Sequence, residues 1–228
     1  MKKLIFITQA KGGCGKSVLS WLHAQRFPEA VFLDMDDATT TTMKQLSYLT
    51  PHQVTFLNSS KTIDRGLLND FFEYVAAHEK DLFISDFGAS ISEQLPHYIN
   101  YFSATALKSA LDAMKIDLTI ICVIGGQNIF VACMDYLEGL ATACNNQIKI
   151  KVAVNNHFLL NETQQQEFAT FCKTLKLKDT FHFNLSRDKN SATQQRVNDV
   201  LKSGTGLQNV SIITKELFRS SIENLPAL

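Results

Sequence analysis

The stretch that decides the fold is Ala10-Lys11-Gly12-Gly13-Cys14-Gly15-Lys16-Ser17, which comes directly after an apolar run at residues 4–7. A strand that ends in a glycine-rich turn and leads into a helix leaves several backbone N–H groups pointing into one concavity, at the positive end of the helix dipole. The glycines permit the turn, Lys16 supplies a charge for the β- and γ-phosphates, and the Ser17 hydroxyl can ligate Mg²⁺. The stretch therefore predicts a polyphosphate-binding loop, with a nucleotide as the leading ligand.

The loop departs from the common pattern G-x-x-x-x-G-K-[ST] in two ways: Ala10 replaces the first glycine, and Lys11 is a second lysine. The form K-G-G-x-G-K-[ST] resembles the deviant Walker A signature of the ParA/MinD family of P-loop ATPases. This resemblance implies catalytic roles for Lys11 and Lys16, with Lys11 reaching across an ATP-sandwiched homodimer to the partner's phosphates. The residues that it implies for ATP binding in the loop are Gly12, Gly13, Cys14, Gly15, Lys16 and Ser17.

The composition describes an ordinary globular chain. Of its 228 residues 45% are apolar and 19% are charged, which is neither the composition of a disordered chain nor that of a membrane-embedded one. No repeat or linker interrupts the pattern, so we expect a single domain over residues 1–228. The formal net charge is zero, so nucleic-acid binding would need a local basic patch.

Short apolar runs alternate with amphipathic stretches, a pattern typical of a mostly parallel sheet with helices on both faces. Together with the loop, it predicts an α/β fold, the three-layer P-loop NTPase fold with a mostly parallel twisted sheet. Strands are expected at residues 3–8, 30–33, 82–85, 118–124, 148–154 and 180–183. Apolar residues at helical spacing predict helix core faces, which are Leu67, Leu68, Phe71, Phe72, Val75 and Ala76; Phe130, Met134, Leu137 and Leu140; and Phe168, Phe171, Cys172 and Leu175.

Carboxylates that serve a phosphate-binding loop should follow neighbouring parallel strands. Asp34 and Asp36 end the apolar run at 31–33, and their spacing makes them point the same way if the chain stays extended. The family resemblance implies that Asp36 faces the γ-phosphate and the attacking water, as a catalytic and metal-site residue, with Asp34 in support. Asp37 stands where the family usually has proline. The alternative is an acidic loop without a catalytic role.

A second segment, residues 81–88, resembles a Walker B strand. Asp86 ends its apolar run and would bind Mg²⁺ through water, since Mg²⁺ keeps most of its hydration shell. Gly88 would allow the turn beneath the γ-phosphate. The expected metal-site residues are therefore Ser17, Asp36 and Asp86, and the expected cofactors are ATP and Mg²⁺.

Polar residues follow two further segments. The run at 151–154 leads into Asn155 and Asn156, and an asparagine here reads the adenine edge in the resembled family; turn formation or helix capping explains either residue as well. The run 38–42, Ala-Thr-Thr-Thr-Thr, falls where the family has a switch segment, although capping of the next helix is the favoured role.

The resemblance implies a Mg²⁺-dependent ATPase that acts as an ATP-dependent dimerising switch. Among its members the chain looks most like a short plasmid partition or stability (StbB-like) ATPase, because it begins at the loop. Such a role implies a partner protein that serves as a DNA-binding adaptor, and nonspecific DNA contacts by basic residues. The candidates for those contacts are Lys173, Lys176 and Lys178, Arg196 and Lys202, and Lys215 with Arg219.

Two other functions stay open at this point. One is a metabolic P-loop enzyme, such as a dethiobiotin-synthetase-like ligase or a small-molecule phosphoryl transferase. The other is a nucleotide-dependent scaffold with negligible hydrolysis. ATPase activity with and without DNA and a partner would separate them.

The remaining features point to the cytoplasm, with the nucleoid as the location if DNA is bound. The N-terminal apolar stretch is too short for a signal peptide. A membrane role is disfavoured because residues 215–228 carry few cations and include Glu216 and Glu223. The five cysteines are scattered without a C-x-x-C pair, so neither a disulfide framework nor a zinc site is expected.

Overall fold

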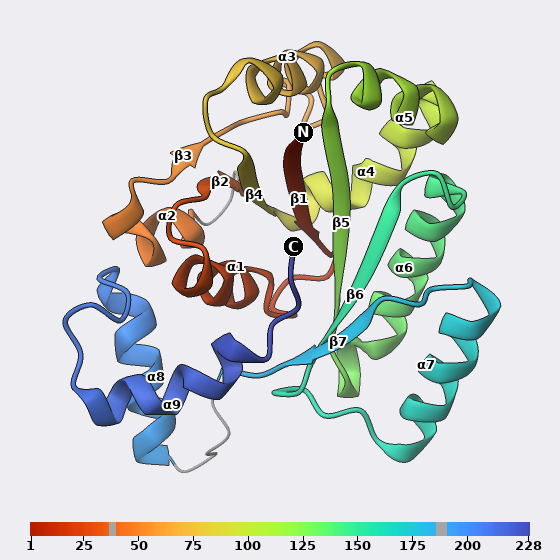
Figure 1. Cartoon of the computed structure of the whole chain (residues 1–228). Coiled ribbons are helices and arrows are strands. Elements are labelled where there is room, and N and C mark those ends of the chain that lie inside the picture. Colours follow the sequence, from red (N-terminus) through yellow and green to blue (C-terminus); the bar gives the residue numbers. More distant parts are fainter. Residues whose placement is uncertain (37–39, 186–190) are drawn as a thin grey trace.

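The structure is a computed structural model that describes residues 1–36, 40–185 and 191–228. Its sheet has the order β3-β2-β4-β1-β5-β6-β7, and all its pairings are parallel (Figure 1). The expected α/β architecture is thereby confirmed. The strands are β1 (Lys2–Thr8), β2 (Val31–Met35), β3 (His52–Gln53), β4 (Leu82–Phe87), β5 (Ile116–Ile124), β6 (Lys149–Asn155) and β7 (Thr180–Phe183).

Helices connect the strands and follow the last of them. They are α1 (Lys16–Arg26), α2 (Thr41–Gln45), α3 (Arg65–Ala77), α4 (Ala89–Phe102), α5 (Ala104–Ala113), α6 (Phe130–Cys144), α7 (Glu162–Thr174), α8 (Ser191–Ser203) and α9 (Ile212–Glu223). Two short 3-10 turns, η1 (Ser47–Leu49) and η2 (Gln127–Ile129), complete the described part. No helix in the described ranges has the length and hydropathy of a membrane span.

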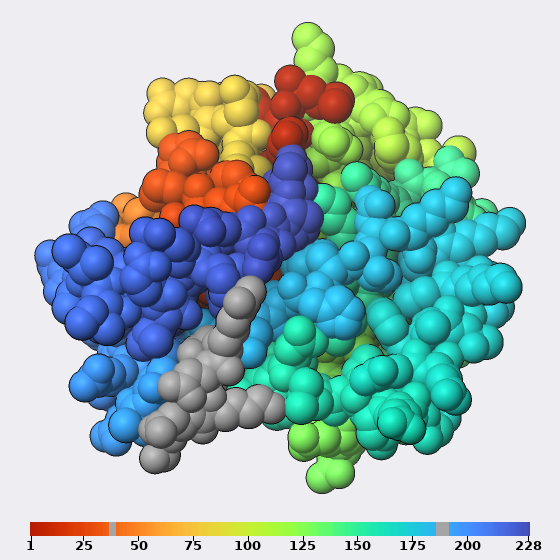
Figure 2. Space-filling view, turned by 60° about the horizontal axis from the view of Figure 1, so that its bottom comes forward, coloured from red at the N-terminus to blue at the C-terminus, as the bar shows by residue number. Residues whose placement is uncertain are grey.

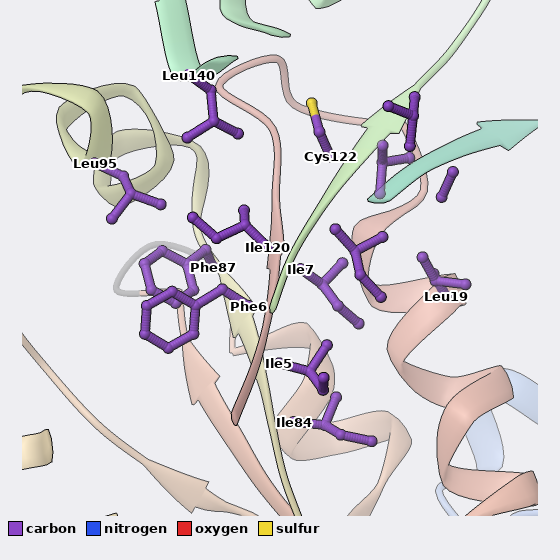
Figure 3. Close-up of a cluster of buried hydrophobic side chains, with 14 of the residues drawn as sticks. Ile5, Phe6, Ile7, Leu19, Ile84, Phe87, Leu95, Ile120, Cys122 and Leu140 are labelled. Atoms are coloured by element: carbon purple, nitrogen blue, oxygen red, sulfur yellow. The ribbon is translucent and has the colours of Figure 1, made fainter. Parts of the chain in front are cut away.

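The central strand β1 separates two apolar layers. On one side Phe6 packs against Phe87 with ring centroids 4.5 Å apart, and Leu95 of α4 lies on that side too (Figure 3). On the other side Ile7 faces Leu19 of α1 (Figure 3). Alternation of side chains along β1 therefore builds both layers at once and holds the strand's end in place.

Helix α3 corrects one expectation. Leu67, placed on its core face by the sequence, is 44% exposed, whereas Leu68, Phe71, Phe72 and Val75 are buried. The buried residues follow i, i+3, i+4 and i+7 from Leu68, so Leu67 lies about 100° away from the stripe in the first turn. An apolar residue beside the stripe is therefore exposed.

The C-terminal helices return to α1. Trp21 packs on Phe218 of α9 with ring centroids 5.1 Å apart. The last residues then run to the N-terminal ends of the strands, where Lys3 Nζ donates to the Leu228 carbonyl (2.6 Å) and Lys151 Nζ donates to the Ala227 carbonyl (2.7 Å). Figure 2 shows this dark blue segment reaching the red N-terminal residues. The C-terminal segment is thus fixed to the base of the sheet.

All five cysteines are free and buried. They act as small apolar core residues.

Candidate nucleotide-binding site

The glycine-rich loop joins the end of β1 to the start of α1, as the sequence predicts. Gly13 and Gly15 have φ of 76° and 104°, in the left-handed region that favours glycine. A Cβ on Gly15 would lie 2.3 Å from Nδ2 of Asn155. Both the backbone conformation and the close approach of Asn155 therefore require glycine at this position.

Gln9 holds the loop against β5 and α4, a role that the sequence does not predict. Its Nε2 donates to the Val123 carbonyl (2.8 Å), its Oε1 accepts from the Lys11 backbone (3.3 Å), and its own backbone N–H donates to Ser92 Oγ (3.2 Å). The side chain is fully buried. A glutamine after a strand carries no sequence signal for such a role, because its partners lie on β5 and α4.

The two lysines of the loop have different surroundings. Lys16 is half-buried, and its Nζ donates to the Gln9 carbonyl (2.9 Å) across the loop. Lys11 is exposed. Cys14 is buried, which raises the pKa of its thiol to about 12, so only the backbone of this residue can contribute to an anion site. Lys16 is placed to serve the loop's own concavity, and Lys11 is accessible from outside.

A pocket of about 410 Å³ lies in front of the loop, and we call it the phosphate-binding pocket after the ligand that the sequence predicts for it. It brings together most of the residues that the sequence singled out, while Lys11, Cys14, Asn155 and Asn156 are not part of its lining. The expected site residues in the lining are Gly12, Gly13, Gly15, Lys16, Ser17, Asp36 and Asp86.

Asp86 is the buried carboxylate of this pocket. Its side chain is 3% exposed, Thr42 Oγ1 donates to its Oδ2, and its Oδ1 has no hydrogen-bond partner among the described residues. Burial raises the pKa of Asp86 to about 6, although the hydroxyls of Thr42 and Ser17 and the charge of Lys16 act in the opposite direction. A buried carboxylate oxygen without a partner is costly unless a cation or donor arrives.

Asp34 has a structural position. It is fully buried at the end of β2, where its Oδ1 accepts from the Asp36 N–H and its Oδ2 from the Met43 N–H, both at 2.9 Å. Burial raises the pKa of Asp34, and these two hydrogen bonds oppose that rise. β2 ends at Met35, so Asp34 lies in the strand and binds the backbone beyond it, whereas Asp36 follows the strand and lines the pocket. That the two side chains point the same way stays a prediction.

Asp36 lies between the phosphate-binding pocket and Gly88. A Cβ on Gly88 would lie 3.0 Å from both Cα and Oδ1 of Asp36, so the glycine allows the two strand ends to approach closely. The departure noted at Asp37 lies outside the described residues, as do Ala38 and Thr39 of the threonine run. The favoured capping role is wrong for Thr40, the N-cap residue of α2, because its side chain makes no capping hydrogen bond. Thr42 of that run lies inside α2, and its hydroxyl donates to Asp86.

Asn155 lies against the loop, and the side-chain amides of both Asn155 and Asn156 have partners. Asn155 is buried, its Nδ2 donates to the Cys14 carbonyl (2.9 Å) and its Oδ1 accepts from the His157 N–H (3.0 Å). Asn156 Oδ1 lies 2.9 Å from Nδ1 of His182. Adenine recognition stays a prediction for both residues, and Asn155 would have to exchange a loop-supporting bond to perform it.

The chain matches no protein-family model, and it matches no curated protein. Among solved structures, the MinD cell division protein of Aquifex aeolicus is 13% identical with a TM-score of 0.53, and the match covers 100% of this chain and 99% of that one. This likeness is one of fold.

Two further structures are similar at lower TM-scores. A putative plasmid partition protein from Borrelia burgdorferi B31 bound to AMPPNP is 17% identical, with a TM-score of 0.47 over 98% of this chain and 97% of that one. McdA of Cyanothece in complex with ATP is 14% identical, with a TM-score of 0.49 over 100% and 98%.

Three observations indicate the same fold. They are the parallel sheet, the glycine-rich loop between β1 and α1, and the match to MinD over the full length of the chain. The chain therefore has the α/β P-loop NTPase fold of MinD, the fold that its resemblance to the ParA/MinD family predicted.

Proposed function

We propose that the chain is a ParA-type ATPase that binds Mg²⁺-ATP in the phosphate-binding pocket and dimerises in the ATP-bound state. The observation that carries the proposal is the unpartnered, buried Oδ1 of Asp86 opposite the glycine-rich loop. Lys16 supplies the charge within the site. The exposed Lys11 is accessible to the phosphates of a second copy.

The residues present fit a hydrated Mg²⁺ ion. No three His, Cys, Asp or Glu side chains converge within the described residues, so an all-protein cage does not exist there. Mg²⁺ in nucleotide sites uses one or two carboxylates together with phosphate oxygens and water. Asp86, the Ser17 hydroxyl and Asp36 would hold the ion, which would neutralise charge on the β- and γ-phosphates.

In hydrolysis different residues of the chain would bind the phosphates, orient the water and neutralise charge. The backbone N–H groups of the loop and Lys16 would bind the phosphates, and Asp36, held by its backbone bond to Asp34, would orient the attacking water. Lys11 of a second copy would contribute charge to the transferring group, a role in which a cation supplied in trans is worth about 10³–10⁵ in rate in GTPases. Without that copy the site is incomplete.

The cellular role that we propose is partition, stability or positioning of plasmid DNA together with an adaptor protein. The basic residues considered for DNA contact are all exposed. Arg219 is paired with Glu216 at 2.7 Å, which makes it the weakest candidate. Because the chain has no net charge, DNA binding would need local basic patches. The two clusters that remain are those at residues 173–178 and 196–202.

The test is ATPase turnover of the full chain with Mg²⁺, with and without double-stranded DNA. We expect slow turnover that DNA or an adaptor stimulates, and no turnover for Lys16→Ala. Transfer of the γ-phosphate to a metabolite would instead support the metabolic enzyme, and ATP binding with neither turnover nor stimulation would support the scaffold.

A further inference from the structure

A separate hollow lies at the opposite end of the strands from the phosphate-binding pocket. It measures about 570 Å³ and is formed where α6 and α7 end and where β6 and β7 begin. The phosphate-binding pocket lies at the carboxyl ends of the parallel strands, whereas this hollow lies at their amino ends. The two are therefore separate sites, and we call the second one the α6–α7 hollow.

The charged side chains that line the α6–α7 hollow are three lysines and one aspartate. Lys149 Nζ lies 3.3 Å from Oδ2 of Asp179, and this ion pair uses the one carboxylate of the lining. The ammonium groups of Lys176 and Lys178 form no ion pair with any residue that the structure describes. The hollow therefore keeps two positive charges that no carboxylate neutralises.

Neutral hydrogen-bonding groups complete the lining. Thr142, Asn145 and Asn146 come from the end of α6, and all three are exposed. Amide N–H groups and hydroxyls can donate to the oxygens of an anion. Small-molecule sites measure about 300–1,000 Å³ and contain a few convergent polar groups. The size and the donors of the α6–α7 hollow thus fit a small anion.

The end of α7 carries a lysine where the backbone favours glycine. The helix ends in a Schellman motif, in which the Leu177 N–H donates to the Cys172 carbonyl (2.9 Å). The second bond of the motif runs from the Lys176 N–H to the Lys173 carbonyl (3.2 Å). Lys176 therefore takes the left-handed position, with φ of 56°, which glycine adopts at lower cost because it has no Cβ. The charge that Lys176 brings to the hollow is gained at the expense of stability.

The basic lining ends at the next hollow along the two helices. That hollow shares Thr174 and Leu175 with the first, and it carries the carboxylates of Glu138 and Glu167. Neither carboxylate is in an ion pair with any described residue. A long polyanion lying along α6 and α7 would meet these negative charges, whereas a small anion is contained within the basic hollow.

We propose that the α6–α7 hollow binds a small phosphorylated anion with at least two negative charges, such as a diphosphate. Lys176 and Lys178 supply the counter-charges, and the amides of Asn145 and Asn146 donate to the phosphate oxygens. The assignment does not depend on the proposed ATPase function, because the two sites lie at opposite ends of the strands. It leaves the cluster at residues 196–202 as the remaining candidate for DNA contact.

The experiment titrates the ¹⁵N-labelled full chain with inorganic pyrophosphate, without Mg²⁺ or nucleotide, and follows the backbone amide resonances by NMR. Shifts at residues 145–146 and 176–178 report the α6–α7 hollow, and shifts at residues 12–17 separately report the phosphate-binding pocket. We expect saturable shifts at the hollow. Lys176→Gly should weaken the affinity there about fivefold, because it removes one exposed charge. The same variant should raise the midpoint of thermal unfolding, because glycine relieves the left-handed conformation.

The matched control is Lys115→Gly. Lys115 is an exposed lysine with φ of 58° at the end of α5, and it does not line the hollow. This variant should also raise the midpoint of thermal unfolding, but it should bind pyrophosphate at the hollow as the wild type does.

Three outcomes would overturn the proposal. The first is the absence of shifts at residues 145–146 and 176–178, including shifts that are confined to residues 12–17. The second is an equal loss of affinity in Lys115→Gly and Lys176→Gly. The third is displacement of pyrophosphate from the hollow by a DNA duplex at a lower concentration of phosphate groups, which would make the hollow part of a DNA-binding surface.

Discussion

At the scale of single residues, Gly15 meets two separate demands, a φ of 104° and the contact with Asn155. We expect Gly15→Ala to lower the free energy of unfolding by about 2 kcal/mol or more, from backbone strain and displacement of Asn155. Nucleotide affinity should fall with it. Chemical denaturation and a fluorescent nucleotide titration measure the two effects.

Two further glycines of the same loop provide the controls. In Gly13→Ala the new side chain suffers only the unfavourable positive φ, since no atom lies within 4 Å of the added Cβ. In Gly12→Ala there is neither a positive φ nor a close contact. Stability should therefore fall in the order Gly12→Ala, Gly13→Ala, Gly15→Ala. Equal losses in all three would refute the argument from geometry.

Asp86 gives the free protein a characteristic pH dependence. Its folded-state pKa of about 6 lies above the usual 3.8, so between these values the folded state holds a proton that the unfolded state releases. Stability should therefore fall as the pH rises through this window, with a full penalty of about 3 kcal/mol above pH 6.

Removing the charge should remove the penalty. We expect Asp86→Asn to be more stable than the wild type at pH 7.5 and to approach it near pH 4, as measured by thermal unfolding without nucleotide. The same variant should lose the extra stabilisation that Mg²⁺ with ATP gives the wild type. A variant that is equally destabilised at both pH values would show that the burial of Asp86 is not costly.

At the scale of elements, α2 is tied to the carboxyl ends of β2 and β4. Its start is held by Asp34, which binds the N–H groups of Asp36 and Met43, and by the hydrogen bond between Thr42 and Asp86. Asp34→Ala should free the start of α2 and cost about 2–4 kcal/mol, because two partly buried N–H donors lose a carboxylate acceptor. Hydrogen exchange at Met43 should accelerate more than exchange within β2.

The matched variant Asp34→Asn keeps an acceptor for one of the two N–H groups. We expect it to fall between Asp34→Ala and the wild type in both stability and exchange. Unchanged exchange at Met43 in Asp34→Ala would contradict the role of Asp34 as the anchor of α2.

Elements and site residues could be predicted where the evidence for them lies in a short contiguous stretch of sequence. The six expected strands appear because each is an apolar run, whereas β3 was missed, since His52 and Gln53 are polar and exposed. The loop and Asp86 were recognisable because their chemistry is contained in short contiguous motifs. The support by Gln9 and the placement of Asn155 were not, because both depend on contacts with residues more than 100 positions away.

At the scale of the whole molecule, the fold places the expected groups at one edge of the sheet. The carboxyl ends of β1, β2 and β4 deliver the glycine-rich loop, Asp36 and Asp86 to one pocket. Lys11 is exposed and lies outside the lining of that pocket, and the proposed function assigns it to the phosphates of a second copy. Under the proposed function, dimerisation, more than hydrolysis alone, is the property by which the protein responds to ATP.

The most direct measurement is the mass of the full chain by light scattering after size exclusion, with Mg²⁺ and either ATP or ADP. We predict the monomer mass of 25.5 kDa with ADP and twice that value with ATP. Lys11→Ala should bind ATP and stay monomeric, whereas Lys16→Ala should lose ATP binding itself. An ATP-dependent dimer of Lys11→Ala, or a wild type that binds ATP and remains a monomer, would contradict the account.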